Sequence, residues 1–430
     1  MEVLYSVILV LVFLLLLILG APIFVAMLAA SFAWILQTGS LQLLTMGAQR
    51  MYASINSFTL LAIPLFIFAG LLMNMAGVSK RLFAYANTLV GHITGGLGHV
   101  NVVASMFFAG MSGSAVADAA GLGAIEMKAM KDVGFDDGFS GAVTAASSTI
   151  GPIIPPSIPM VLFGGLTSVS VGRLFLGGFI PGILMGFSLM LVVYFIAKKR
   201  NYPVSPKASF KENLNAFLDA LPSLIMPIII LGGILSGLFT PTEAATVACL
   251  YALFLGVFVY KEINLKNLWT LLLETMKNTA QVMAIIAAAG LFGWIMTYQG
   301  IPAAVIKSIV GFTDSRFVVL LIINVILLIL GCFMEGNAIL ILTVPILVPI
   351  AKEFGIDLVH LGVIMCLNSM IGTITPPVGM CLYPVMTLGN LTMGELTKEI
   401  LPFLGILIVA LLIVTYVSPL ATFLPTLLMG

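Results

Sequence analysis

Charge is scarce in this chain of 430 residues, of which only 8% are Asp, Glu, Lys or Arg and 61% are hydrophobic. A soluble globular domain has about a quarter of its residues charged, so the composition excludes that class. The mean hydropathy of +1.19 indicates a polytopic membrane protein embedded in a lipid bilayer. Because the net charge is only +1 and no Lys/Arg-rich segment is interleaved with aromatic residues, nucleic acid is not expected as a partner.

Histidine and cysteine are also rare, with three and four residues. The cysteines show no CxxC spacing and lie in apolar runs, at Cys249, Cys332, Cys366 and Cys381. We therefore expect them to pack in the core, with no disulfide framework, zinc site or other cofactor. Paired catalytic carboxylates and a nucleophile motif are missing as well, so an intramembrane enzyme is a weak alternative.

Long apolar runs are abundant. A helix that crosses a bilayer needs about 20 apolar residues, and the candidates are roughly 4–36 (one long or two short helices), 58–77, 171–197, 220–237, 241–260, 281–299 and 400–427. The first run has no positive segment before it, so we expect a retained membrane segment and not a signal peptide. Charges scattered over 80–92 and 264–278 predict helices at the membrane interface.

Two further apolar runs are interrupted by short polar stretches that contain glycine. These runs are 98–131, around Gly110–Ser114, and 316–351, around Met334–Asn337. Each predicts a re-entrant hairpin. Lipid cannot satisfy exposed backbone groups, so the tips must be buried in protein or line a wet cavity, which makes them site candidates.

Residues 131–156 and 352–377 repeat each other. The identical pairs are Lys131/Lys352, Gly134/Gly355, Asp136/Asp357, Gly141/Gly362, Ser148/Ser369, Ile150/Ile371, Gly151/Gly372, Ile153/Ile374, Pro155/Pro376 and Pro156/Pro377. Such a duplication within an apolar chain is typical of transporters built from inverted repeats with broken helices. The broken helices are expected over 138–166 and 358–388.

The duplication divides the chain into four parts. We expect N-terminal scaffold helices in 1–57, a first repeat in 58–200, central scaffold helices with an interfacial helix in 201–280, and a second repeat in 281–430. The basic loop from Lys198 to Lys211 should be cytoplasmic. Counting membrane crossings from that loop places the two hairpins on opposite faces of the membrane. Arg316 and Lys352 are then on the external side, against the rule that Lys and Arg collect in cytoplasmic loops.

The segment Gly151–Pro159 cannot continue as a helix, because its prolines lack an N–H and clash with the preceding turn. Freed carbonyls such as that of Pro155, with the hydroxyl of Ser148, would form an oxygen cage for Na⁺. A simple proline kink satisfied by neighbouring helices is the alternative. In the second copy, which ends at Pro376–Pro377, Thr373 and Thr375 replace Pro152 and Ile154 and add hydroxyl oxygens.

The helix N-termini at both hairpin tips favour an anionic solute between them. Residues expected to contact that solute are Ser112, Ser114, Ser157, Glu335 and Asn337. Glu335 is an intramembrane carboxylate, which would balance a cation, orient solute hydroxyls, carry a proton or form an ion pair.

Three other polar features admit a functional or a structural role. Asp118 lies one turn from the first tip, where it would serve the site, cap the backbone or meet a lysine. Arg173 is better explained as an interfacial anchor than as a carboxylate ligand, and Thr240–Glu243 resembles a helix capping box.

Several motifs together resemble those of one transporter family. They are the segments 66–70, 112–118, 151–159, 240–245 and 372–377. The chain is similar over its whole length to the large membrane subunit of tripartite ATP-independent periplasmic (TRAP) transporters. The resemblance implies an all-α, elevator-type secondary transporter of the ion transporter kind in the bacterial inner membrane.

The resemblance also implies Na⁺-driven uptake of an organic acid, such as sialic acid or a C4-dicarboxylate. The partners would be a periplasmic solute-binding protein and a small four-helix membrane subunit. The implied sodium ligands are Ser112, Gly113, Ser114 and Gly151 in one half, and Gly336, Asn337, Gly372, Thr373 and Thr375 in the other. A stand-alone Na⁺-coupled anion carrier of the same architecture, with no binding protein, is the alternative.

Overall fold

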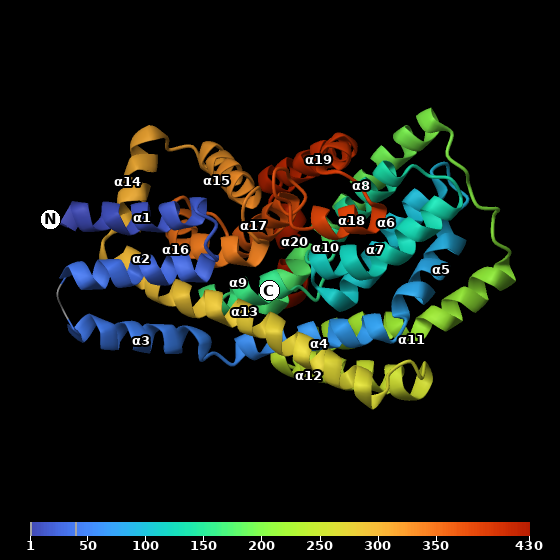
Figure 1. Ribbon diagram of the computed structural model, residues 1–430, viewed down its shortest axis with the longest axis horizontal. Helices are drawn as coiled ribbons and strands as arrows, with labels where there is room; N and C mark the ends of the chain where they lie inside the picture. The colour runs from blue at the N-terminus through green and yellow to red at the C-terminus, as the bar shows by residue number, and fades with distance from the viewer. Residues whose placement is uncertain (1, 39–40) are drawn as a thin grey trace.

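The computed structural model describes residues 2–38 and 41–430, and the described residues form helices with no strand (Figure 1). The first ten are α1 Glu2–Ile18, α2 Ile23–Thr38, α3 Leu41–Ile55, α4 Ala62–Met75, α5 Val78–Val90, α6 Gly96–Ser112, α7 Ala115–Asp132, α8 Asp137–Ser148, α9 Ile158–Thr167 and α10 Val171–Arg200. The others are α11 Phe210–Leu235, α12 Pro241–Phe254, α13 Leu265–Tyr298, α14 Ile301–Phe312, α15 Arg316–Gly331, α16 Gly336–Glu353, α17 Leu358–Gly372, α18 Leu382–Gly389, α19 Met393–Tyr416 and α20 Pro419–Met429.

Six helices of the described residues are long and apolar enough to cross a membrane. They are α10, α11, α12 with the π-helical turn Leu255–Val259, α13, α16 and α19. A bent pair, α3 with the segment Thr59–Met75, adds a seventh at an angle of 60°. The expected class, an all-α polytopic membrane protein, is confirmed.

Both expected hairpins are present. The chain reverses between α6 and α7 at Gly113, whose φ of 60° is in the left-handed region that favours glycine. Ser114 then caps α7 by accepting a hydrogen bond from the backbone of Ala117 at 3.4 Å. The second hairpin turns between Gly331 and Gly336, and Glu335 is the residue before α16.

Both expected helix breaks are present as well. Residues 149–157 separate α8 from α9, and residues 373–381 separate α17 from α18. Each break contains a cis Pro–Pro bond, at Pro155–Pro156 and at Pro376–Pro377. The duplicated sequence therefore forms a duplicated structure.

The two repeats exchange their short half-helices. α9, which follows the first break, packs against α16 of the second hairpin, and α18, which follows the second break, packs against α7 of the first. The labels of α9 and α16 lie in the left half of Figure 1, and those of α7 and α18 in the right half. Each repeat thus completes the surroundings of the other. The first break is buried throughout, whereas the second has exposed residues at Pro377 and Met380.

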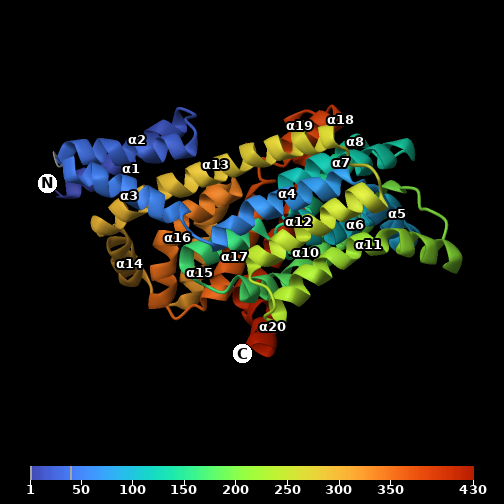
Figure 2. The same ribbon diagram turned by 90° about the horizontal axis from the view of Figure 1, so that it is seen from below.

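A second group of helices runs along one side of this unit. α13 packs against α2, α3 and α4, and α4 packs against α12. The oblique course of α13 beside α4 is clear in Figure 2. We call this group the scaffold.

Two expectations about helix boundaries were wrong. The segment 264–278 is not a separate interfacial helix but the first half of α13, so the expected boundary at 280/281 falls inside one helix. No glycine or proline precedes Gly290 in α13, and its charged residues Lys266, Glu274 and Lys277 are exposed, so nothing interrupts the helix.

The run 400–427 forms two helices instead of one, because the chain turns between Tyr416 and Pro419. The first run, 4–36, also forms two helices, the shorter of the two options considered, separated around Gly20 at a φ of 80°. Residues 1, 39 and 40 of the N-terminal part lie outside the described residues. The charged segment 80–92 does form a short helix, α5, and its place at the membrane interface stays a prediction.

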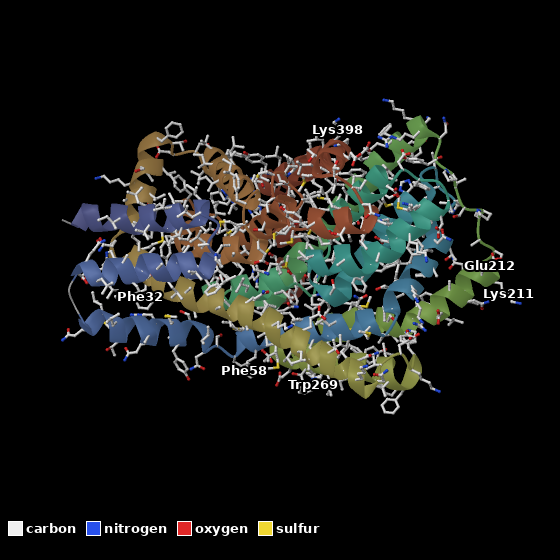
Figure 3. All side chains as sticks on the ribbon, viewed as in Figure 1. Phe32, Phe58, Lys211, Glu212, Trp269 and Lys398 are labelled. Atoms are coloured by element: carbon white, nitrogen blue, oxygen red, sulfur yellow. The ribbon has the colours of Figure 1, made fainter. Side chains whose placement is uncertain are left out.

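Large apolar side chains cover much of the outer surface. Phe32, Phe58 and Trp269 point outward in Figure 3, and their exposed fractions are 42%, 62% and 65%. Lys211 and Glu212 lie at the right-hand end of the molecule in the same view. Apolar flanks with charged ends suit a lipid environment.

Ionic contacts join α10, α19 and the start of α8. Arg200, which ends α10, makes a two-pronged contact with Glu399 of α19 at 2.9 and 2.8 Å, and its other nitrogen donates to Asp136 before α8 at 3.1 Å. Tyr202 also donates to Asp136. Burial, together with that carboxylate, raises the pKa of Tyr202 to about 12, so its phenol keeps its proton at neutral pH.

Candidate functional site

The first hairpin tip lies directly against the first helix break. A Cβ added at Gly113 would lie 2.9 Å from the carbonyl oxygen of Pro156. The hydroxyl of Ser112 donates to Oδ1 of Asp118, a side chain only 2% exposed. The other oxygen, Oδ2, has no hydrogen-bond partner among the described residues, and a Cβ added at Gly151 would lie 2.3 Å from it. We call the surroundings of this oxygen the first pocket.

Few hydrogen-bond donors of the protein are available to the oxygens of the first pocket. Ser148 donates its hydroxyl proton to the carbonyl of Ala145 at 2.8 Å, so its lone pairs remain available. No lysine or arginine is paired with Asp118 in the part of the chain that the structure describes. A buried carboxylate needs a counter-charge or a proton. A small cation held by oxygens fits this arrangement.

The second tip lies against the end of α17 in the same manner. A Cβ added at Gly336 would lie 3.7 Å from the carbonyl oxygen of Ser369. The side-chain amide of Asn337 donates to Oε1 of Glu335 at 2.6 Å. Its side-chain oxygen, Oδ1, is buried with no hydrogen-bond partner among the described residues. Across the break, Thr373 and Thr375 donate to carbonyls one turn back, at 2.6 and 2.8 Å. The Thr373 hydroxyl also accepts from the thiol of Cys381 at 3.4 Å, so each hydroxyl keeps at least one lone pair free. We call these surroundings the second pocket.

The second break is held closed by the backbone. The N–H of Cys381 donates to the carbonyl of Thr373 at 2.9 Å, and the N–H of Val378 donates to the carbonyl of Cys332 at 3.3 Å. Gly331 and Gly372 pack against each other so closely that a Cβ on Gly331 would lie 2.6 Å from the α-carbon of Gly372. The break is thus an ordered turn, with its hydroxyl oxygens on Thr373 and Thr375.

Buried polar pairs lie beneath both pockets, and sequence reasoning did not identify them. In the first repeat Asn101 of α6 donates to Thr144 at 2.7 Å and accepts from Ser147 at 2.7 Å. In the second repeat Asn324 of α15 accepts from Asn368 at 2.9 Å and donates to Thr415 at 2.9 Å.

The signal for these pairs was available in the duplication. Aligning the hairpin tips at Met111 and Met334 places Asn101 over Asn324, and aligning the repeated segments places Ser147 over Asn368. The first helix of each hairpin is therefore joined to the first half of its broken helix at equivalent positions.

Some residues singled out from the sequence lie away from the pockets. Ser157 caps α9, donating to the carbonyl of Pro152 and accepting from the N–H of Met160 at 3.2 Å, and it is fully buried. Its polar atoms are thus used locally. Thr240 and Glu243 form the expected capping box. Arg173 is half-buried at the start of α10, without a carboxylate partner in the described chain.

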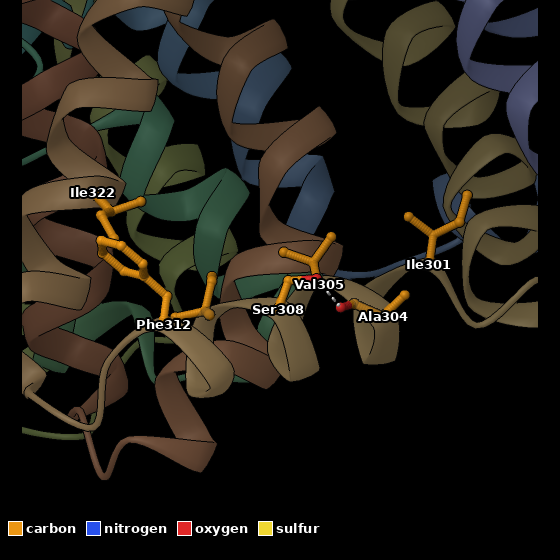
Figure 4. A pocket seen from close by; sticks show the side chains of 7 residues that line it. Ile301, Ala304, Val305, Ser308, Phe312 and Ile322 are labelled. Carbon is orange, nitrogen blue, oxygen red and sulfur yellow. Dashed lines mark hydrogen bonds between the residues drawn. The ribbon is translucent and has the colours of Figure 1, made fainter.

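An open apolar groove of about 430 Å³ also lies outside both pockets. It is lined by α14 and α15 residues, namely Ile301, Ala304, Val305, Ser308, Ile309, Phe312 and Ile322 (Figure 4). The hydroxyl of Ser308 is bonded to the carbonyl of Ala304 at 3.0 Å. With no charged group in its lining, this groove does not suit an ionised solute.

Two hairpins facing two helix breaks, in a membrane protein whose described residues form helices, define a fold that solved membrane transporters share. The Alcanivorax borkumensis YdaH transporter has the same fold, with a TM-score of 0.64 at 15% identity, over 85% of this chain and 86% of that one. Neisseria gonorrhoeae MtrF matches with a TM-score of 0.51 at 14% identity, over 87% and 83%.

Residues 10–420 match the family described as tripartite ATP-independent periplasmic transporter, DctM component, and the chain belongs to that family. It is 46% identical over 411 residues to the sialic acid TRAP transporter large permease protein SiaM of Vibrio cholerae, covering 96% of each chain. It is 43% identical to the Haemophilus influenzae sialic acid permease SiaT, over 97% of this chain and 68% of that one. Identity to the Pseudomonas aeruginosa C4-dicarboxylate permease DctM is 42%, over 88% of each.

The predicted resemblance to TRAP large permeases is therefore confirmed. The chain is a multi-pass protein of the inner membrane.

Proposed function

We propose that this permease imports an organic acid of the sialic acid or C4-dicarboxylate type, driven by a Na⁺ gradient and without covalent chemistry. The observation that carries the sodium part is the unpartnered oxygen of Asp118, buried against Gly151 within a set of hydroxyl and carbonyl oxygens. Broken helices of secondary transporters coordinate Na⁺ with such oxygens. The substrate part is supported by relatives named for sialic acid and for C4-dicarboxylates, both of which are carboxylate solutes.

The proposed cation ligands form two sets, one for each pocket. The first comprises Ser112, Gly113, Ser114, Ser148, Gly151 and Pro155, to which the structure adds Asp118. The second comprises Gly336, Asn337, Gly372, Thr373, Thr375 and Pro376. Backbone carbonyls and hydroxyls supply most of the oxygens in both sets.

The solute is proposed to bind between the two hairpin tips. The N-termini of α7 and α16 carry partial positive charge, which favours a carboxylate. Ser112, Ser114 and Asn337 offer hydrogen bonds beside it, and Glu335 would orient solute hydroxyls directly or through water. Ser157 was expected in this set, but its bonds to Pro152 and Met160 make a contact with the solute less favourable.

The partners are proposed to be a periplasmic solute-binding protein and a small four-helix membrane subunit, which is what a tripartite system requires. Alternating access would be of the elevator type, with the hairpins and broken helices moving as one unit against the scaffold. The exchange of α9 and α18 between the repeats supports this, because it joins both pockets into one packed body.

The membrane potential would contribute directly to such a cycle. Moving one charge through 100 mV is worth about 2.3 kcal/mol, so two Na⁺ would contribute roughly 4.6 kcal/mol. With a monoanionic acid the cycle would carry net positive charge inward. Uptake of a monoacid should therefore generate current.

The test is uptake into proteoliposomes that contain the permease and the small membrane subunit, with and without the binding protein. An inward Na⁺ gradient should drive accumulation of at least one acid from a panel of sialic acids, C4-dicarboxylates and other organic acids. Accumulation that is equal with K⁺ or choline in place of Na⁺ would refute sodium coupling. Full activity without the binding protein would instead favour the stand-alone carrier.

A further inference from the structure

We infer that Cys381 is a positioning residue that couples the two cation pockets, so that an ion in one strengthens binding in the other. This inference rests on the proposed sodium-driven function. Cys381 is not itself among the proposed cation or solute ligands, but its thiol contacts Thr373, which is a proposed cation ligand. Its role is to connect the surroundings of two ions.

The contacts of Cys381 reach both breaks. Its thiol donates its one proton to the hydroxyl of Thr373 in the second break at 3.4 Å, and the hydroxyl of Ser148 at the end of α8 is an alternative acceptor for the same proton. The side chain is fully buried. One thiol thus lies between groups that belong to different repeats.

The backbone of Cys381 has a similar double attachment. Its N–H is bonded to the carbonyl of Thr373 at 2.9 Å, which fixes it to the second break. It is also the residue from which α18 starts, and α18 packs against α7 and α8 of the first repeat. A shift of Thr373 on ion binding would therefore move both the thiol and the helix that borders the first pocket.

The residue that precedes the short half-helix of the first repeat has no such connection. Ser157 precedes α9 as Cys381 precedes α18, but its hydroxyl turns back to the carbonyl of Pro152 in its own break. Cys381 makes no cap bond to α18, and its thiol faces Thr373 and Ser148.

These contacts have a thermodynamic consequence. A cation that orders Thr373 would fix Cys381 and restrict Ser148, so the second cation would meet a pocket that is already ordered. Coupling between two binding sites is reciprocal and typically changes affinity by about 5–150-fold. The sodium dependence of uptake should then be steeper than that of a single site.

The test compares Cys381→Ala with Cys366→Ala in proteoliposomes that contain the small membrane subunit. Cys366 is also fully buried, in α17, and makes no hydrogen bond that the described residues show, so the control removes the same atom without touching either break. For Cys381→Ala we expect the Hill coefficient for Na⁺ to fall toward 1 and the half-saturating Na⁺ concentration to rise at least about fivefold. The rate at saturating Na⁺ should stay near that of wild type.

Cys381→Ser should restore the steep sodium dependence, because a hydroxyl at this position can also donate to Thr373. Sodium titrations of Cys381→Ala that match those of Cys366→Ala would overturn the inference and leave sodium coupling intact. Wild-type uptake that does not depend on Na⁺ would refute the proposed function itself. If Cys381→Ala does not purify as a monodisperse protein, the comparison of Cys381→Ser with wild type decides, since a shallower titration for serine would contradict the coupling role.

Discussion

Gly331 and Gly372 touch through their α-carbons, so that a Cβ on Gly372 would lie 2.5 Å from the α-carbon of Gly331. Gly331 ends α15, and Gly372 ends α17 at the second break. No flexible side chain is available there to move aside, because the contact is between two backbones. The position of the second hairpin relative to its break therefore depends on the absence of side chains at both residues.

The first prediction concerns Gly372→Ala. The added methyl group should force α15 away from the break and destabilise the protein by about 1–3 kcal/mol, as overpacked interiors do. We expect a lower thermal unfolding midpoint in detergent and loss of Na⁺-driven uptake. Gly405→Ala in α19 is the control, because no atom lies within 4 Å of a Cβ added there. Equal midpoints and uptake for the two variants would show that the contact is not needed.

The second prediction concerns Asp118→Asn. The amide can still accept the hydrogen bond from Ser112, but the negative charge facing Gly151 is lost. Loss of a charged ligand from a buried site costs at least about 1.4 kcal/mol, which corresponds to at least about a tenfold rise in the half-saturating Na⁺ concentration. The measurement is a sodium titration of uptake. Asp137→Asn, which removes an exposed carboxylate paired with Lys131 at 2.9 Å, should titrate like wild type. The assignment fails if both variants behave alike.

The third prediction tests the duplicated polar pairs. Asn324→Leu leaves the buried amide of Asn368 without its side-chain acceptor. Asn101→Leu removes the acceptor of the Ser147 hydroxyl and the donor to the Thr144 hydroxyl. Each change should lower the free energy of unfolding by about 1–3 kcal/mol. The two effects should add, because the pairs lie in different repeats. Thermal unfolding of both single variants and the double variant measures this, with exposed Asn215→Ala as the control.

Local chemistry explains what could be predicted from the sequence. Prolines 155–156 and 376–377 forbid a continuous helix whatever surrounds them, so both helix breaks and their equivalence could be predicted from the sequence. The glycine-containing hairpin tips followed from the same reasoning. In contrast, the contact of Asp118 with Gly151, and that of Cys381 with Ser148, joins residues that only the packing of α7, α8 and α18 brings together. No periodicity within one helix encodes such contacts.

The ends of helices were also difficult to predict from the sequence. Charge along 264–278 predicted an interfacial helix, yet the helix formed by these residues continues without interruption into the apolar part of α13, since exposed charges on one end do not terminate a helix. The equivalence of Asn101 and Asn324 was present in the duplication, but it appears only when the hairpins are aligned at their tips, two residues out of register with the broken helices.

The last prediction concerns the ionic contacts at the end of α10. Arg200 binds both oxygens of Glu399 and one oxygen of Asp136, and so joins α10, α19 and the start of α8. Both side chains of the Arg200–Glu399 pair are partly exposed, so solvent screens the contact and its loss should cost only about 1 kcal/mol. Glu399→Arg replaces attraction with repulsion and should lower the thermal midpoint more than Glu399→Gln does.

The double variant Arg200→Glu with Glu399→Arg restores one ion pair and should recover part of the loss, but not all of it, because Asp136 then faces a carboxylate. Uptake at saturating Na⁺ should follow the thermal midpoint across this series. The half-saturating Na⁺ concentration should not change, since Asp136 and Ser148 lie at opposite ends of α8. A sodium affinity that shifts with the charge series would instead connect this end of α10 to the ion sites.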